Sequence, residues 1–350
     1  MKISQITKSQ LSSKEKAFIH NELKMVSRSF YLTLKVLPRE IFTPAGIAYL
    51  IARYIDDIVD NESLPINSKT SHLYEIRKSF TNTLSNNDLS KSLHCNIKGC
   101  CSKITSYKKV FDNLSSENQH IVSKVLLHIT DGMSFELEKL VPHSPNEVNF
   151  LNTYSELDTY IYKIAGSVGE FFSNLILLHE KKLELSDTDY FFELSSDFGK
   201  ALQLTNIIRD FNSDLIEGKC YIPKSSLEHL DFDSYKLLNH HENQIGLALS
   251  ELLPLTTKYY VRAATYIMLI PKSLPRLRLA ALWPFLIGVE TLNKLASNKN
   301  QHDLKTPIKV KRKWIYIMIT KSLFLIHNDK TLKFILNRQI QKLYYRVSNL

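Results

Sequence analysis

Apolar residues recur at the three- and four-residue spacing of amphipathic helices along most of the chain. Segments 157–180 and 245–270 show this spacing over lengths that suit helices. Glycine is scarce, at 9 of 350 residues, and the 11 prolines are scattered, whereas strand-rich folds need many turns. We find no GxGxxG, no P-loop and no alternation of strand and helix patterns. The pattern therefore predicts an all-α protein with one core.

The length of 350 residues, 44% of them hydrophobic, suffices for one large domain or two small ones. We expect a single helical domain over residues 1–350. Residues 61–110 are rich in Ser, Asn and Lys, which predicts a variable excursion between helices. His94, Cys95, Cys100 and Cys101 lie together there, but their spacing fits no standard zinc pattern, so cytosolic thiols are the simpler interpretation and a zinc site the alternative.

The N-terminal stretch MKISQITKSQLSSKEK is polar and lacks the apolar centre of a secretory signal. No run of 18 apolar residues occurs, and the nearest, LAALWPFLIGV at 279–289, is short and contains a proline. These features predict a cytoplasmic protein without a membrane-spanning helix.

The stretch RYIDDIVDN at 53–61 places three aspartates within five positions. In a helix, Asp56 and Asp60 share one face, where two carboxylates repel each other unless a cation lies between them. A solvated acidic turn of a surface helix is one interpretation. The apolar neighbours in AGIAYLIARYIDDIV favour a mostly buried helix that carries its acids inward, where they need a partner such as a divalent metal.

A second acidic stretch, QLTNIIRDFNSDLIEGKCYIP, repeats this arrangement from residue 203 onward. Asp210 and Asp214 are four residues apart, and Asn206 and Gln203 fall on the same helical face. Two such helices facing each other would form an oxygen-lined cleft, which suits Mg²⁺ together with the oxygens of a substrate phosphate. The two stretches predict a metal–diphosphate site, with an arginine close to each acidic pair.

The formal net charge of +10 is concentrated at the C-terminus. Residues 305–350 hold eleven Lys or Arg and one Asp, so the rest of the chain is close to neutral. The same segment has helical apolar spacing, through Leu332, Ile335, Leu336, Ile340 and Leu343. Such a basic amphipathic helix favours contact with an anionic membrane surface, the alternative being a helix that packs on the core with solvated lysines. Nucleic-acid binders more typically spread basic residues over a docking face with interleaved aromatics, so no nucleic-acid partner is expected.

Three further stretches leave alternatives open. In VSRSFYLTLKVLP at 26–38, Ser27 could cap a helix N-terminus and Arg28 could reach a diphosphate. In TYIYKIAGSVGEFFSNLI at 159–176, several small residues permit close approach of another helix, the commoner cause, or of a bulky ligand. The charges of IKVKRKWIY at 308–316 indicate a solvated face, or a site for a phosphate-bearing cofactor or lipid headgroups.

Together these stretches resemble the squalene/phytoene synthase family of head-to-head prenyl transferases. SRSF followed by LP, Y-x-x-x-R-x-x-D-D-x-x-D, AGSVGE, and QLTNIIRD-x-x-x-D with G-x-x-Y-x-P occur in the family's order and spacing, over roughly residues 20–320. The resemblance implies a class I isoprenoid synthase fold, in which helices surround a central apolar cavity and two aspartate-rich motifs hold Mg²⁺ at its mouth.

The resemblance also implies roles for individual residues. Asp56 and Asp60 match the first aspartate motif, and Asp210 and Asp214 match the second, with Asn206 and Gln203 upstream. The residues that match the diphosphate-contacting positions and the motif around the diphosphate end of the substrate are Ser27, Arg28, Ser29, Phe30, Arg53 and Arg209. Tyr49 and Tyr160 match tyrosines that line the reaction cavity.

The implied reaction joins two farnesyl diphosphates into presqualene diphosphate, in a dry tunnel that keeps water from the carbocation. Squalene synthases then reduce this intermediate with NADPH. The stretch IKVKRKWIY resembles the one thought to bind the NADPH phosphate, which indicates Lys309, Lys311 and Arg312 as the cofactor site. Squalene synthesis is therefore favoured.

One departure keeps other members of the family open. The adjacent acids Asp56 and Asp57 are common in phytoene and dehydrosqualene synthases, which use no nicotinamide. Phytoene, dehydrosqualene or presqualene diphosphate synthesis is the alternative, and a relative that has lost catalysis is a second one.

Overall fold

The computed structural model describes residues 11–27, 30–81, 100–142, 144, 147–181, 183–227, 244–297 and 310–349. Within these ranges helices form nearly all of the regular structure, and the two strands, β1 (Asn149–Phe150) and β2 (Lys219–Cys220), have two residues each. The predicted all-α fold is confirmed. The chain divides into two compact units, Met1–Leu137 with Phe171–Lys182, and Glu138–Glu170 with Leu183–Leu350. The single domain stays a prediction.

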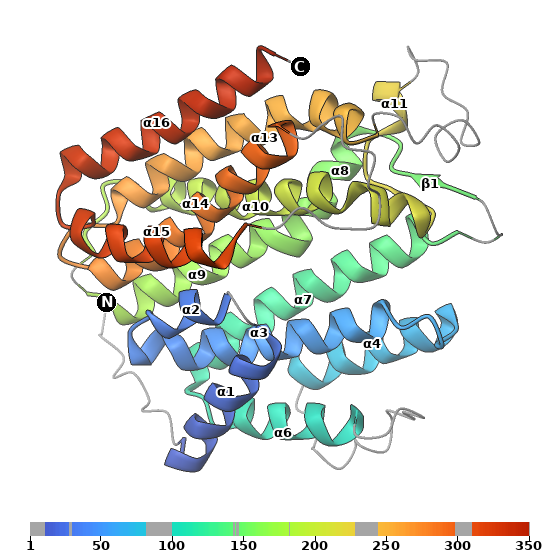
Figure 1. Cartoon of the computed structure of the whole chain (residues 1–350). Coiled ribbons are helices and arrows are strands. Elements are labelled where there is room, and N and C mark those ends of the chain that lie inside the picture. The colour runs from blue at the N-terminus through green and yellow to red at the C-terminus, as the bar shows by residue number, and fades with distance from the viewer. Residues whose placement is uncertain are drawn as a thin grey trace. The chain divides into compact units, whose positions relative to one another are not determined.

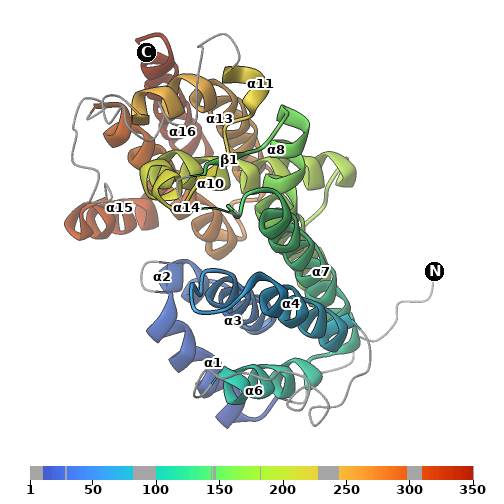
Figure 2. The same ribbon diagram turned by 90° about the vertical axis from the view of Figure 1, so that its right-hand side faces the viewer.

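The first unit is built around α3 (Arg39–Val59). This helix packs against α1 (Ser13–Val26), α2 (Phe30–Lys35), α4 (Ile66–Thr81) and α6 (Cys100–Asp112), and Figure 2 shows α3 and α4 side by side. The unit also contains most of α7 (Ser116–Lys139). Nearly every residue from Ile41 to Ile51 of α3 is buried, which fixes the helix and leaves its C-terminal acids at one edge.

Residues 61–110 are more than a connection between helices, because α4 and part of α6 lie within them. His94 and Cys95 lie outside the described residues, as do the side chains of Cys100 and Cys101 at the start of α6. The zinc alternative therefore falls outside the described part of the chain.

The second unit is built around α10 (Thr188–Ile216). Its N-terminus is capped by Asp187, whose carboxylate accepts a hydrogen bond from the backbone N–H of Tyr190 at 2.9 Å. Helix α10 packs against α8 (Tyr154–Ile161), the π-helical turn η1 (Tyr162–Gly166), β2, α13 (Gln244–Leu269) and α14 (Pro275–Ser297). The remaining helices of this unit are α11 (Lys224–Leu227), α15 (Arg312–Leu325) and α16 (Asp329–Val347). Helix α9 (Ser167–His179) begins in this unit, and its residues from Phe171 onward belong to the first unit.

The apolar face of α16 packs on the protein rather than facing outward. Figure 1 shows α16 running alongside α13, and the helix contacts both α13 and α14. Leu332, Leu336 and Leu343 are at most 1% exposed, and Ile340 is also buried. The core-packing alternative for these residues is therefore the observed one, because helical apolar spacing is the same for a helix on a core and a helix on a membrane.

A buried arginine ties the C-terminal helices together. Arg278 of α14 donates hydrogen bonds to the carbonyl oxygens of Ile270 and Ile326 and to a carboxylate oxygen of Asp329. The Nη1 distances are 3.2 Å to Ile326 and 2.6 Å to Asp329, and Arg278 is 2% exposed. One side chain thus joins the end of α13, the end of α15 and the start of α16.

Among the described residues, one helical stretch is long and apolar enough to cross a membrane by length and composition, namely Tyr154–His179, which joins α8, η1 and α9. Its mean hydropathy is 1.2 over the best window, of which 39% is buried. Core helices of soluble proteins have the same properties. The sequence pattern indicated no such helix because Lys163 and Glu170 interrupt the apolar run.

Candidate active site

The first acidic stretch forms the C-terminal end of α3. Asp60 is the residue that caps the helix, and its backbone N–H donates to the carbonyl oxygen of Asp56 at 2.9 Å. The side chain of Asp56 is 35% exposed, whereas Asp57 and Asp60 are exposed residues. The expectation that the acids point inward therefore holds in part for Asp56 and is wrong for the other two, since Ile55 and Ile58 take the buried face.

Arg53 bridges two of these acids. Its Nη1 lies 3.0 Å from Oδ2 of Asp56, and its Nη2 lies 2.7 Å from Oδ1 of Asp57. Partial burial lowers the pKa of the Arg53 guanidinium, but the two carboxylates outweigh burial and raise it overall. Burial also raises the pKa of the Tyr49 phenol, one turn before Arg53, against the opposing effect of that arginine. Tyr49, Arg53, Asp56 and Asp57 therefore form one electrostatically coupled group.

Asp56 carries the most perturbed carboxyl of this group. Burial, followed by repulsion from Asp60, raises its pKa from 3.8 to about 6, even though Arg53 opposes the shift. Glu136 of α7, which is 5% exposed, adds to the negative potential at Asp56. Sequence reasoning missed Glu136, although an acid at an apolar-periodic position, three residues after the buried Met133, is a usable signal.

The second acidic stretch lies in the C-terminal half of α10. Gln203, Asn206, Asp210 and Asp214 are all partly exposed and share one face, as their spacing predicted. The residues between them, such as Ile207 and Phe211, are buried and hold the helix in place. The face can thus offer two amide groups and two carboxylates to a ligand.

Arg209 forms two hydrogen bonds to the carboxylate of Asp210, its neighbour in the sequence. Its Nε lies 2.8 Å from Oδ1 of Asp210, and its Nη2 contacts Oδ2. The hydrogen bond to Asp210 raises the pKa of Arg209, and Asp214 contributes to the shift. Each acidic stretch therefore holds at least one carboxylate paired with a nearby arginine, Asp56 with Arg53 and Asp210 with Arg209.

The chain leaves α10 through a turn that requires glycine. Gly218 has φ +78°, and a Cβ there would lie 2.6 Å from the carbonyl oxygen of Glu147. The turn leads into β2, which pairs in parallel with β1. It delivers Tyr221 onto Tyr160, with ring centroids 5.1 Å apart, an interplanar angle of 26° and hydroxyl oxygens 3.5 Å apart.

Both rings of this pair are buried. Sequence reasoning chose Tyr160 and missed Tyr221, although the G-x-x-Y-x-P pattern contains it.

The small residues after Tyr160 serve close packing on α10. A Cβ on Gly169 would lie 1.8 Å from the carbonyl oxygen of Ser195, and one on Gly199 would lie 2.0 Å from that of Ala165. Backbone therefore meets backbone where η1 and α9 cross α10. Helix packing, one of the two alternatives for the small residues of 159–176, accounts for Gly169, and Gly199 makes the matching close contact from α10.

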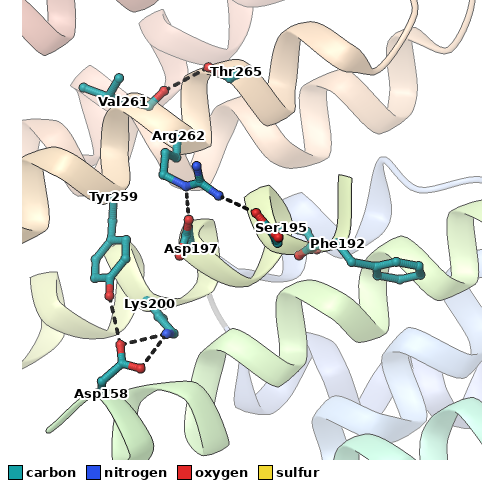
Figure 3. A network of polar contacts seen from close by, with 10 residues as sticks. Asp158, Phe192, Ser195, Asp197, Lys200, Tyr259, Val261, Arg262 and Thr265 are labelled. Atoms are coloured by element: carbon teal, nitrogen blue, oxygen red, sulfur yellow. Dashed lines mark hydrogen bonds and ion pairs between the residues drawn. The ribbon is translucent and has the colours of Figure 1, made fainter. Parts of the chain in front are cut away.

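A polar network fixes α8 and α13 to the N-terminal half of α10 (Figure 3). Lys200 lies 2.7 Å and 2.9 Å from the two carboxylate oxygens of Asp158, which also accepts from the Tyr259 hydroxyl at 2.9 Å. Arg262 of α13 contacts Asp197 and lies 3.2 Å from Glu193. These contacts pair most of the charges on this part of α10 and hold the helix that carries Asp210.

Each acidic helix end, taken by itself, offers oxygen donors suited to Mg²⁺. Among the described residues, no three His, Cys, Asp or Glu side chains converge to hold a metal. Mg²⁺ usually binds one or two carboxylates together with water and substrate phosphate oxygens, rather than an all-protein cage. Burial, followed by repulsion from Asp60, raises the pKa of Asp56, and a bound cation would favour the charged form of this carboxylate. The residues present thus fit Mg²⁺ bound together with a diphosphate.

The other predicted site residues have varied outcomes. Ser27 ends α1 and its hydroxyl donates to the carbonyl oxygen of Leu23 at 2.7 Å, so the N-cap interpretation is wrong. Arg28, Ser29 and Lys309 lie outside the described residues, as does the side chain of Phe30. Lys311 immediately precedes α15 and makes no side-chain capping hydrogen bond, Arg312 is the first residue of the helix, and both are exposed.

The family model for squalene/phytoene synthase matches residues 23–314. This chain belongs to the squalene/phytoene synthase family. It is 24% identical to squalene synthase ERG9 of Saccharomyces cerevisiae over 302 residues, which cover 86% of this chain and 65% of the yeast protein. It is 28% identical to squalene synthase 1 of Arabidopsis thaliana, with 60% and 46% covered. The matches thus span about two thirds or less of the length of these curated relatives.

Solved structures show the same fold. A complex of TcSQS with the ligand BPH1237 has a TM-score of 0.75 at 19% identity and covers 96% of this chain and 97% of its own. A dehydrosqualene synthase in complex with a ligand has a TM-score of 0.63 at 20% identity, with 89% and 96% covered. The fold is therefore the all-α isoprenoid synthase fold.

Proposed function

We propose that this chain is a prenyltransferase that condenses two farnesyl diphosphates head to head, with Mg²⁺, and reduces the resulting presqualene diphosphate to squalene with NADPH. The observation that carries the proposal is the repeated arrangement of an arginine and a carboxylate at the acidic ends of α3 and α10. The family membership and the squalene synthases among the matched relatives support it.

The acidic ends would bind Mg²⁺ and the diphosphate of the substrate. Asp56 and Asp60 on α3, and Asp210, Asp214 and Asn206 on α10, would hold the metal, which when bound neutralises charge on the departing diphosphate. A planar guanidinium with fixed donors suits phosphate oxygens as well as carboxylates. Arg53 and Arg209 would therefore position the acids in the ligand-free protein and contact the diphosphate in the complex. Gln203, on the same face of α10 as Asp210, would also contact the diphosphate.

The aromatic residues suit the cationic part of the reaction. Tyr160 and Tyr221 present a buried stacked pair, and the negative face of a phenol ring attracts a cation. Tyr49 lies one helical turn from Arg53, where its ring is close to the diphosphate end proposed here. Burial of Tyr160 and Tyr221 would also keep water away from a reactive carbocation.

The second step distinguishes the candidate products. The squalene proposal uses NADPH, and Lys311 and Arg312, both exposed at the start of α15, would bind its phosphate together with Lys309. Phytoene-type, dehydrosqualene or presqualene diphosphate synthesis without NADPH is the second candidate, favoured by the adjacent pair Asp56 and Asp57. All four motif aspartates are present, which favours an enzyme over a non-catalytic relative.

We also propose a cytoplasmic protein that is peripheral to the membrane. The farnesyl chain and a squalene product both dissolve in lipid. The basic segment 305–350 would supply attraction to anionic headgroups.

Product analysis by gas chromatography and mass spectrometry tests the proposal. The purified chain is incubated with farnesyl diphosphate and Mg²⁺, with and without NADPH. Squalene that forms only with NADPH is the expected result. Dehydrosqualene or presqualene diphosphate regardless of NADPH would support the second candidate, and no product from farnesyl or geranylgeranyl diphosphate would contradict both.

A further inference from the structure

Helix α15 exposes a strip of large apolar side chains to solvent. Phe324 is 80% exposed, Tyr316 62%, Leu323 48% and Ile317 45%. Positions 316, 317, 320, 323 and 324 fall on one side of a helix with 3.6 residues per turn. Four of these five positions are therefore apolar, although exposed helix faces are normally polar.

The inner side of the same helix is anchored, so this exposure follows from a defined orientation. Met318 is 7% exposed and Ser322 is 3% exposed. The Ser322 hydroxyl oxygen accepts a hydrogen bond from the indole N–H of the buried Trp283, on α14, at 2.8 Å. Rotating α15 to hide Phe324 would break this bond and expose Met318.

The charge around the strip is positive. Lys313 and Lys321 are exposed on α15 beside the apolar residues. Within the described residues 310–349 the one acid is Asp329, which is bonded inward to the buried Arg278. Two copies that met through this strip would bring like charges together, whereas an anionic lipid surface complements them.

We propose that the outer face of α15, formed by Tyr316, Ile317, Leu323 and Phe324, is the surface that docks on an anionic lipid bilayer. The apolar side chains enter the boundary between headgroups and acyl chains, and Lys313 and Lys321 lie at the headgroups. The inference rests on the membrane contact proposed above. It assigns that contact to the outer face of α15, because the apolar face of α16 is buried against the protein. It does not depend on which reaction the chain catalyses.

Vesicle co-sedimentation tests the inference, using vesicles of phosphatidylcholine alone and of phosphatidylcholine mixed with phosphatidylglycerol. The double variant Ile317→Ser/Phe324→Ser is expected to bind mixed vesicles at least about tenfold more weakly than the wild type. Each substitution removes apolar area that would be buried in the bilayer. The matched control, Met25→Ser/Tyr74→Ser, removes two side chains that are 67% and 61% exposed on α1 and α4 and is expected to bind like the wild type. Lys313→Glu/Lys321→Glu is expected to lose the preference for anionic vesicles.

Several outcomes would overturn the inference. Equal binding by the wild type and the Ile317→Ser/Phe324→Ser variant would exclude this face while leaving membrane contact in place. No binding by the wild type would remove both membrane claims but not the enzymatic one, which is measured separately in detergent micelles. A lipid-free dimer of the wild type that the double variant abolishes, found by sedimentation equilibrium, would assign the face to a second copy. Circular dichroism melts establish that all variants fold.

Discussion

Arg209 and Asp210, adjacent in the sequence, are joined by a two-point ion pair at the acidic end of α10. Adjacent residues on a helix point about 100° apart, so the long arginine must fold across the helix surface to reach its neighbour. The pair therefore holds the Asp210 carboxylate in one orientation on the face that also carries Asn206 and Asp214.

Replacing Asp210 by asparagine should abolish most of the product formation without unfolding the protein. Asp210→Asn keeps the shape but removes a carboxylate proposed to hold Mg²⁺, so we expect the rate to fall on the order of 10²-fold or more. Asp197→Asn is the control, because Asp197 lies on the same helix about 20 Å away and is paired with Arg262. Full activity of Asp210→Asn, measured as diphosphate release from farnesyl diphosphate, would contradict the assignment.

Arg209→Lys separates charge from geometry. Lysine keeps the positive charge but cannot form two parallel hydrogen bonds to a carboxylate or a diphosphate. We expect weaker substrate binding, seen as a KM raised about tenfold, which corresponds to about 1.4 kcal/mol. A variant with unchanged KM and a reduced kcat would instead show that Arg209 acts only in the transition state.

The raised pKa of Asp56 predicts a trade-off between stability and function. Because the folded-state pKa is about 6 and the ordinary value is 3.8, the folded protein binds more protons than the unfolded chain between these values. Stability is therefore lost as pH rises through this window, and the full loss persists above it. Asp56→Asn should remove the loss and raise the free energy of unfolding by up to about 1 kcal/mol at neutral pH, since the partly exposed carboxylate is screened by solvent.

Urea unfolding of the wild type and Asp56→Asn across a pH series measures this effect. The two proteins should converge below pH 3.8, diverge as pH rises from 3.8 to about 6, and differ by a constant amount above it. Addition of Mg²⁺ with inorganic diphosphate should stabilise the wild type more than the variant, which should also lack activity. A variant that is less stable than the wild type at neutral pH would show that the Arg53 ion pair outweighs the burial of Asp56.

The acidic helix ends could be predicted from the sequence because their spacing is local. Asp56 and Asp60, and Asp210 and Asp214, share faces by virtue of helical periodicity alone. Glu136 could not be placed beside Asp56 in this way, because the two belong to helices separated by most of the first unit. The stacking of Tyr221 on Tyr160 likewise depends on the turn at Gly218 and on the pairing of β1 with β2.

The C-terminal helices show a different limit. Leu332 and Leu336 have the spacing of a membrane-facing helix and of a core-facing one, so periodicity cannot choose between them. Only the tertiary contacts of α16 decide for the core. The exposed strip on α15 could not be predicted from the sequence. Tyr316, Ile317 and Phe324 lie among equally apolar residues that face the protein, so the pattern does not show which of them are exposed.

Alanine at Gly169 or at Gly199 should strongly destabilise the second unit. The added Cβ would lie within 2.0 Å of a backbone carbonyl oxygen in either case, and backbone cannot move as a side chain can. We expect a loss of about 3 kcal/mol in the free energy of unfolding for each variant. Gly46→Ala is the matched control, since its Cβ would meet only side-chain atoms of Ile19 and Leu23 at 2.9 Å and alanine favours the helix by about 1 kcal/mol.

These three variants are compared by denaturant unfolding. Similar losses of stability for all three variants would mean that the clash with backbone atoms is not the cause of the loss. Near-wild-type stability for Gly169→Ala would show that α9 can shift away from α10.

Arg278→Met should be among the most destabilising single changes in the C-terminal part of the chain. The guanidinium satisfies the carbonyl oxygens of Ile270 and Ile326 and the carboxylate of Asp329, and methionine fills similar space without a donor. Leaving these acceptors buried without a partner should cost about 3–5 kcal/mol. Arg338→Met, at an exposed position of α16, is the control and should change stability by no more than about 0.5 kcal/mol.

Thermal unfolding followed by circular dichroism provides the comparison. Equal stability of the two variants would mean that water reaches the three acceptors when Arg278 is removed, and that α13, α15 and α16 are held together by apolar packing alone.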